Sequence, residues 1–420
     1  MTSHQHGASG APYRWYLVGL LFFCAGLNYA DRASLASVFP LLSRDLQMSD
    51  MALASTGSFF LWSYAIASPF AGYVADRVSR SRLIAISLAA WSISSGLAGF
   101  AASANQLLAT RVLLGLSECM YLPAAVALIA HHHPIGTRAT AMAIHVAGMS
   151  VGVIGGGFLG GYLGERFGWR AMCFILGFGG LALAAAAYFT LHDGPPREEK
   201  LTAPPRASLR DLPELLRTPT FVVIILESMI ISVGTWIFYN WLPLFYHETF
   251  GLSLAGAGFS GTFMLESSAV LGMTLGGIQS DRAAAQWPGR RMLLLAISYW
   301  LAAPCLLIFV FSRSYWLISA SLFLFALLRS AGTANEHPTV CDVLPEARRS
   351  TAVGMMNSAN CFAGGLGVMA AGYFKSAIGL AGIMSSVSVL VLVAAVLTQF
   401  GYVKFIRRDL ASAAAAREAA

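Results

Sequence analysis

An acid and a base stand side by side in the first apolar stretch of the chain. Asp31 and Arg32 end the sequence Asn-Tyr-Ala-Asp-Arg, which begins at Asn28 and lies in a run that is otherwise apolar from Trp15 to Pro40. A charge at the centre of a bilayer costs roughly 2.5 to 3.5 kcal/mol on insertion scales, so ionisable residues there usually face a cavity or a partner. The pair indicates a site for a solute or a proton, and the alternative is a structural ion pair that fixes neighbouring helices.

A second acid and base lie seven residues apart in the fourth apolar stretch. Arg111 and Glu118 return to nearly the same face of a helix, about 10 Å apart along its axis. Since the rest of that stretch is apolar, we expect this face to point into the protein, where Asp31 and Arg32 could meet it. Pairing of Arg111 with Glu118 is the structural alternative.

These residue types can couple a proton to an anion. A carboxylate in a low-dielectric cavity holds a proton more readily, and a nearby arginine favours its release. When an anionic substrate binds Arg32 or Arg111, the freed Asp31 or Glu118 should protonate, which links the two ligands. The apolar stretches contain three cations and five acids, so we expect at least one acid to be protonated; the acids are Asp31, Glu118, Glu227, Glu266 and Glu336.

Arg329 and Glu336 repeat the seven-residue spacing in the tenth stretch, where Glu336 stands near the end of the stretch. A gate or a structural pair explains them better than a substrate contact. Glu227 and Glu266 stand one to a helix and are functional candidates without an assigned partner.

Composition places the chain in a membrane. Hydrophobic residues make up 57% of the 420 residues and charged residues only 11%, against about 25% charged in soluble domains. The length suits about a dozen spans of 20 to 25 residues. The net charge of +7 does not require nucleic acid, because basic residues in cytoplasmic loops produce it.

The elements that position the charged residues are two sets of six helical spans. A polar stretch rich in proline, residues 192–218, cannot lie in a bilayer core and is expected to be a cytoplasmic linker. It separates an N-terminal six-helix bundle, residues 1–191, from a C-terminal one, residues 219–420. The expected spans are 14–41, 51–75, 83–102, 105–130, 139–163, 170–191, 220–247, 255–279, 291–312, 314–338, 350–375 and 379–406.

The loops also predict orientation. With a cytoplasmic N-terminus, 19 of the 27 lysines and arginines fall on the cytoplasmic side. We therefore expect both termini inside, in a multi-pass protein of the plasma (inner) membrane, and a monomer.

Metal and cofactor sites are not expected. The six cysteines lie in or beside apolar runs without a CxxC pair. Three adjacent histidines, His131 to His133, cannot converge on one ion and have no evident fourth ligand. Neither a phosphate-binding loop nor a catalytic constellation is evident, so the sequence predicts no enzyme.

The second and eighth spans end in the same pattern, GxxxDR. Gly72 precedes Asp76-Arg77, and Gly277 precedes Asp281-Arg282, with the two aspartates 205 residues apart. Parallel six-span repeats are a known transporter construction.

With this repeat the chain resembles the major facilitator superfamily over essentially its full length. The stretch GYVADRVSRSR, which begins at Gly72, is similar to that superfamily's signature loop. The resemblance implies that glycine permits close helix approach and that Asp76-Arg77 and Asp281-Arg282 latch the cytoplasmic gate. Ser79 replaces the usual glycine, and residues 283–288 are an insertion in the second copy, so the first latch is the firmer expectation.

Within that superfamily the chain resembles the anion:cation symporter family. The motifs that carry this likeness are NYADR at Asn28, Arg111-Gly115-Glu118 with Pro123, FGWR ending at Arg170, and WLPLFY from Trp241. Members carry sugar acids and other organic anions, commonly with protons. The resemblance implies that Asp31 and Glu118 handle protons, that Arg32 and Arg111 face the anion, that Tyr64 lines the cavity, and that Asn357 or Asn360 contacts substrate.

Three further features bear on the substrate. Tyr239 and Asn240, in the usual moving helix of a transporter, either contact substrate or only pack. Met149 stands where sugar-acid carriers often have an amide, so a less hydroxylated or aromatic carboxylate is an alternative. The N-terminal half also resembles spinster-type lysolipid carriers. The expected function is proton-coupled symport of a small organic anion; the other readings are a lysolipid carrier and a non-transporting receptor.

Overall fold

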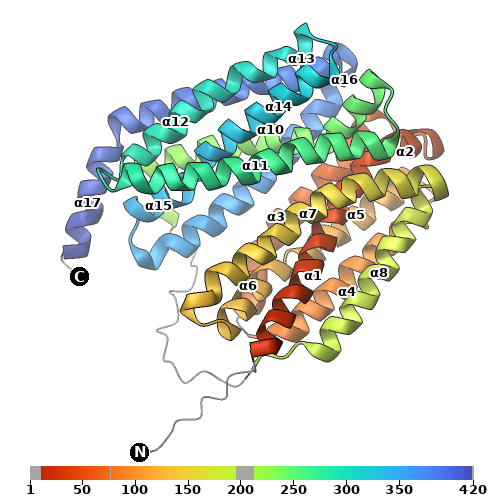
Figure 1. Ribbon diagram of the computed structural model, residues 1–420, viewed down its shortest axis with the longest axis horizontal. Helices are drawn as coiled ribbons and strands as arrows, with labels where there is room; N and C mark the ends of the chain where they lie inside the picture. Colours follow the sequence, from red (N-terminus) through yellow and green to blue (C-terminus); the bar gives the residue numbers. More distant parts are fainter. Residues whose placement is uncertain (1–10, 76, 195–211, 419–420) are drawn as a thin grey trace, which may run out of the picture. The chain divides into compact units, whose positions relative to one another are not determined.

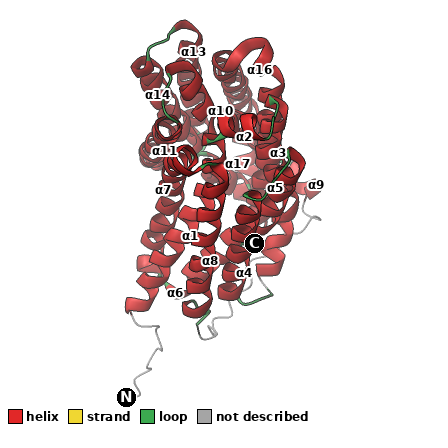
Figure 2. Ribbon diagram, turned by 90° about the vertical axis from the view of Figure 1, so that its right-hand side faces the viewer, coloured by secondary structure: helices red, strands yellow, loops and turns green. Residues whose placement is uncertain are grey.

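The computed structural model describes residues 11–75, 77–194 and 212–418, and within these ranges the regular elements are all helices (Figure 2). Contacts divide the chain into two compact units: residues 1–200 with 253–259, and residues 201–252 with 260–420. The predicted all-α membrane architecture is confirmed.

The first unit contains the helices that carry both predicted acid and base pairs (Figure 1). They are α1 (Ala11–Ser37), α2 (Phe39–Asp45), α3 (Asp50–Ala75), α4 (Arg80–Ala98), α5 (Ala104–Glu118), α6 (Tyr121–His132), α7 (Ile135–Phe167) and α8 (Trp169–Thr190).

The second unit repeats this arrangement with more interruptions. Its elements are α9 (Leu212–Leu216), α10 (Pro219–Phe250), α11 (Leu254–Ala284), α12 (Arg290–Ala302), the 3-10 turn η2 (Ala303–Leu307), α13 (Ile308–Phe311), α14 (Tyr315–Thr333), α15 (Glu336–Val343), α16 (Glu346–Lys404) and α17 (Ile406–Glu418). Residues 253–259, which include the first turns of α11, belong to the first unit.

Eight helical stretches of the described chain are long and apolar enough to cross a membrane. One of them, Arg348–Lys404, holds two spans, because Gly379 inside it has a left-handed φ of 67° and a non-helical ψ of 170°. With the long helices α1, α3 and α11 added, this gives the twelve spans expected from the sequence.

Several spans expected to be continuous are broken. The expected span 14–41 ends as a helix at Ser37, and the expected span 105–130 is interrupted after Glu118. Pro123 has no N–H to bond the carbonyl of Cys119, four residues earlier, which is the residue that follows α5. Pro338 and Ala334 stand in the same relation at the end of α14, and Pro304 lies in the 3-10 turn of the ninth span.

Equivalent helices pack together in each unit. In the first unit α1 packs on α7, α3 on α5 and α4 on α8; in the second unit α10 and α12 both pack on α16. Glycines let α11 approach α14 closely, since a Cβ at Gly272 would lie 2.2 Å from the carbonyl oxygen of Leu327. Because these pairs join spans at the same positions of each half, the internal repeat in the sequence is also a repeat in packing.

The start of α4 is held by a carboxylate from beyond α8. Asp193 Oδ1 accepts a 2.7 Å hydrogen bond from the backbone N–H of Ser81. Burial by itself would raise the pKa of Asp193, but hydrogen bonds from Ser79 and Ser81 outweigh it and hold this pKa below its usual value. The negative charge also suits a helix N-terminus.

We expect Asp193→Asn to destabilise the protein at pH 7 by about 0.3 to 1 kcal/mol, because the amide oxygen can still accept from Ser81 but the charge that favours a helix N-terminus is lost. A carboxyl whose pKa is lowered by folding stabilises the protein above its ordinary pKa, and this contribution is lost as the pH falls through the lowered value. The difference in thermal unfolding between variant and wild type should therefore shrink below about pH 4. An equal difference at pH 7 and pH 3 would contradict the cap.

Candidate functional site

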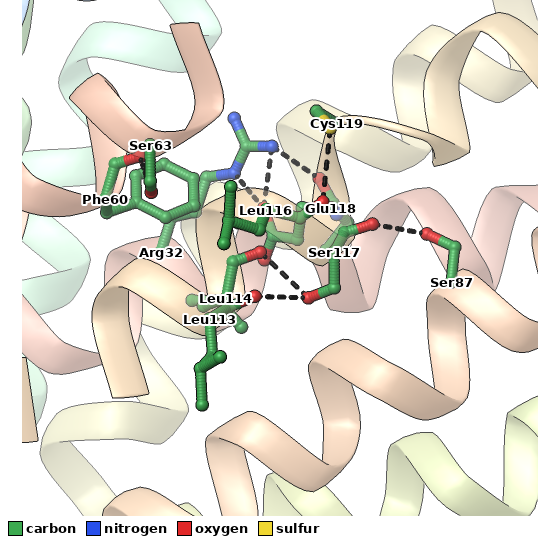
Figure 3. A network of polar contacts seen from close by, with 11 residues as sticks. Arg32, Phe60, Ser63, Ser87, Leu113, Leu114, Leu116, Ser117, Glu118 and Cys119 are labelled. Atoms are coloured by element: carbon green, nitrogen blue, oxygen red, sulfur yellow. Dashed lines mark hydrogen bonds and ion pairs between the residues drawn. The ribbon is translucent and has the colours of Figure 1, made fainter. Parts of the chain in front are cut away.

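Arg32 is the centre of a polar network inside the first unit (Figure 3). Oε2 of Glu118 lies 2.7 Å from both Nε and Nη2 of Arg32. Nη2 also donates a 2.9 Å hydrogen bond to Oδ1 of Asn28, one helical turn earlier on α1. The Glu118 side chain is 0% exposed and that of Arg32 is 14% exposed, so the ion pair is buried with only the guanidinium partly accessible.

Aromatic rings surround the same guanidinium. Its carbon lies 4.7 Å from the ring centre of Tyr29, 4.9 Å from that of Phe60 and 5.2 Å from that of Tyr64. Rings within about 6 Å attract a cation through their quadrupole, most strongly where water is excluded. The rings therefore add to the attraction that holds the Arg32 guanidinium in place beside Glu118.

Glycines set the distance between the helices of this network. A Cβ at Gly115 of α5 would lie 2.1 Å from Ser63 Oγ and 2.5 Å from the carbonyl oxygen of Phe60, both on α3. On the other side of α1, a Cβ at Gly156 of α7 would lie 2.4 Å from the Cα of Ala30. Small residues at these positions permit backbone contact, which brings Glu118 and the aromatic rings within reach of Arg32.

Asp31 faces a different set of helices from Arg32. It lines, together with Arg111, Ser95 and Cys173, a small void of about 10 Å³ among α1, α4, α5 and α8. Asp31 is 3% exposed and Arg111 5% exposed. A larger cavity, of about 490 Å³, lies around Ser81 and Asp193 at the other end of α4 and includes neither residue.

Neither of the two structural ion pairs considered as alternatives forms within the described residues. Asp31 does not pair with its neighbour Arg32, nor does Arg111 pair with Glu118. Instead Arg32 of α1 pairs with Glu118, and Asp31 of α1 lines the void together with Arg111. Three buried atoms have no hydrogen-bond partner: Asp31 Oδ2, Arg111 Nε and Glu118 Oε1. The site can therefore form further hydrogen bonds.

The model of the Major Facilitator Superfamily matches residues 21–288 and 259–418. The chain belongs to the major facilitator superfamily. The predicted fold of two pseudo-symmetric six-helix bundles is confirmed.

Relatives with similar sequences are named as transporters of several kinds. The chain is 26% identical over 296 residues to the probable galactarate/D-glucarate transporter GudP of Bacillus subtilis, over 64% of this chain and 65% of that protein. The match thus spans slightly less than two thirds of that relative. An MFS-type efflux pump of Mycolicibacterium smegmatis is 28% identical over 293 residues, which is 68% of this chain and 67% of the pump.

A solved structure extends the likeness over nearly the whole chain. A bacterial homologue of the human lysosomal transporter Spinster, crystallised in an inward-facing and unoccupied conformation, superposes with a TM-score of 0.85. The alignment covers 95% of this chain and 99% of that chain at 22% identity. At this identity the likeness shows a shared major facilitator fold.

The second copy of the superfamily's signature loop contains an ion pair between Asp281 and Arg291. In the first copy, Asp76 and the surroundings of Gly72 lie outside what the structure describes. Arg77 is exposed. In the second copy Arg282 is exposed, and Asp281 lies 3.5 Å from Arg291, which the sequence analysis did not single out as a gating residue. Arg291 also pairs with Asp342 at 2.5 Å, from α15, so the second loop is tied to the tenth span.

The expected substrate residues of the second unit have separate hydrogen-bond partners. Tyr239 donates a hydrogen bond to Glu266 of α11, and Asn240 donates to the carbonyl oxygen of Trp236 at 3.0 Å. Asn360 accepts from Ser228 at 3.0 Å, whereas Asn357 is exposed. Tyr239 thus joins an acid, and Asn360 is bound to a neighbouring helix.

Some members of the Arg32 network were not singled out from the sequence. Asn28, Tyr29 and Phe60 contact the guanidinium alongside the expected Tyr64. Asn28 carried a signal, because residues four apart face each other on a helix. Phe60 carried none, since it is one of 26 phenylalanines in an apolar chain.

The triple histidine forms ordinary hydrogen bonds, including one from His133 Nε2 to the carbonyl oxygen of Arg14 at 3.1 Å.

Proposed function

We propose that this protein is a transporter that carries a small organic anion, a sugar acid or another carboxylate, together with protons by alternating access. The observation that carries the proposal is the buried contact of 2.7 Å between Arg32 and Glu118. A carboxylate is the group that an arginine fork binds best. A substrate carboxylate therefore competes with Glu118 for Arg32, and the displaced Glu118 then takes up a proton rather than remain buried as a lone charge.

The names of the relatives agree with an anionic substrate. Galactarate and D-glucarate, in the name of the Bacillus subtilis relative, are sugar acids. A protein from Arabidopsis thaliana that is 27% identical to this chain over 266 residues is named a sodium-dependent phosphate transport protein. Basic residues in the predicted loops support a plasma-membrane protein with both termini in the cytoplasm. We further propose a monomer whose bundles, 1–191 and 219–420, are joined by a linker at 192–218.

The test is uptake of labelled carboxylates into proteoliposomes, with and without an inward proton gradient. One proton carried with each monoanion should give about tenfold accumulation per pH unit, since a pH unit is worth about 1.4 kcal/mol. The panel includes sugar acids, aromatic carboxylates, inorganic phosphate and one lysophospholipid. Accumulation of the lysophospholipid alone would favour the spinster-like alternative, and binding without accumulation would indicate a receptor.

The matched variants change one arginine at a time. Arg32→Gln should lose carboxylate binding, whereas Arg44→Gln should retain it, because Arg44 is 78% exposed and pairs only with its neighbour Asp45. Removing Arg32 leaves Glu118 buried without its partner, at a cost of about 3 to 5 kcal/mol. The double variant Arg32→Gln/Glu118→Gln removes that penalty, so a folded double variant that still binds carboxylates would overturn the proposal.

A further inference from the structure

The second unit contains its own pair of buried carboxylates. Glu227 of α10 is 0% exposed, Glu336 at the start of α15 is 8% exposed, and Tyr299 of α12 is 0% exposed. The Tyr299 hydroxyl donates a 3.0 Å hydrogen bond to Oε1 of Glu336. Three helices therefore bring two acids and a phenol together, none of which belongs to the Arg32 network.

Glu227 is the unusual member of this cluster. Both of its carboxylate oxygens are buried, and the donor that acts on it is the Tyr299 hydroxyl, whose single proton is directed to Glu336. The charged group that acts on it is Glu336, which has the same sign. A carboxylate that shares its donor with another acid is poorly solvated in a low-dielectric interior, and the second carboxylate nearby adds repulsion.

Glu336 is better placed to carry a negative charge. It accepts the hydrogen bond of Tyr299 and experiences the positive charge of Arg329 on α14. Arg329 itself donates to Thr235 Oγ1 and Ser330 Oγ, each at 3.1 Å, so it neutralises Glu336 through space rather than by direct contact. On the side that faces α16, Ser228, the residue after Glu227, donates a hydrogen bond to Asn360, which carries no charge.

We propose that Glu227 and Glu336 form a proton-binding site, with the proton on Glu227 and the negative charge on Glu336. Two neighbouring buried carboxylates titrate as a pair and hold one proton between them. The proton comes from solvent, binds one Glu227 oxygen and makes that carboxyl neutral. Tyr299 and Arg329 then stabilise the charge that remains. This site goes beyond the proposed symport and does not depend on the identity of the substrate.

The experiment is infrared difference spectroscopy of the full chain, purified in lipid nanodiscs, across a pH titration in potassium buffer. Protonated carboxyls have a C=O stretching band that carboxylates lack. Glu227→Gln should remove one such band at pH 7, whereas Glu248→Gln should not, because Glu248 is 47% exposed and pairs with Lys375. An unchanged spectrum of Glu227→Gln would overturn the proposal, as would loss of the band on adding sodium, which would indicate a cation in place of the proton.

A second variant tests the same site if Glu227→Gln does not fold. Tyr299→Phe removes the hydroxyl that stabilises the charge on Glu336, so the pair should hold its proton to a higher pH. A hydrogen bond to a charged group is worth about 1.5 to 3 kcal/mol, which corresponds to a shift of at least about one pH unit. A band that titrates at the wild-type pH in Tyr299→Phe would show that the two carboxyls are not a unit.

Discussion

Glu118→Gln is expected to abolish proton-driven accumulation of the substrate while leaving exchange across the membrane intact. The glutamine has the same size and keeps an oxygen that accepts from Arg32, at the place where Oε2 of Glu118 now lies 2.7 Å away. It cannot gain or lose a proton, however. Accumulation in proteoliposomes should therefore fall from about tenfold per pH unit to none, and counterflow of labelled against unlabelled carboxylate should continue.

The matched control is Glu248→Gln, at an exposed glutamate of the second unit, which should accumulate substrate like the wild type. Full accumulation by Glu118→Gln would mean that another group carries the coupled proton. If the variant loses both counterflow and accumulation, Glu118 serves only to fold the site. The two failures are thus separable from each other and from the expected result.

Gly156→Ala is expected to destabilise the first unit, whereas Gly155→Ala, one residue away on the same helix, is expected to be harmless. A Cβ at Gly156 would lie 2.4 Å from the Cα of Ala30 and 2.6 Å from its carbonyl oxygen, while a Cβ at Gly155 would meet nothing within 4 Å. Backbone atoms cannot move aside as the end of a flexible side chain can. Overpacking of this kind costs about 1 to 3 kcal/mol or more.

The comparison removes the effect of helix propensity, because alanine favours a helix over glycine by about 1 kcal/mol at both positions. Thermal unfolding of the two variants in detergent gives the difference directly. Because Ala30 precedes Asp31, the displaced backbone should also weaken carboxylate binding in Gly156→Ala. Equal unfolding temperatures for the two variants would contradict the close contact between α1 and α7.

The helical spans could be predicted because the bilayer imposes a length and an apolar composition that few other structures share. The interruptions were harder to predict. An apolar stretch such as 105–130 remains long enough to cross the membrane whether or not one of its carbonyls lacks a partner. Pro123 was visible in the sequence, but only the helix ends at Glu118 and Tyr121 show that the break follows the buried acid directly.

The sequence also placed two acids and two bases in one region without determining which would meet. Residues seven apart share a face on any helix, so Arg111 and Glu118 were equally placed to pair with each other or with α1. The outcome depends on how closely α3 can approach α5 and α1 can approach α7, which the glycines at positions 115 and 156 decide. Likewise Glu227 and Glu336 occupy separate spans, and their meeting at Tyr299 is a property of the tertiary packing.

Asp31 and Arg32 are consecutive residues of one helix, so their side chains leave it about 100° apart. Each therefore faces different partners, although both follow directly after Ala30, where α1 contacts the backbone of α7 at Gly156. Any turn of α1 that loosens Arg32 from Glu118 swings Asp31 by the same angle. A rotation of α1 therefore moves both buried side chains together, and this coupling needs no ligand that touches both.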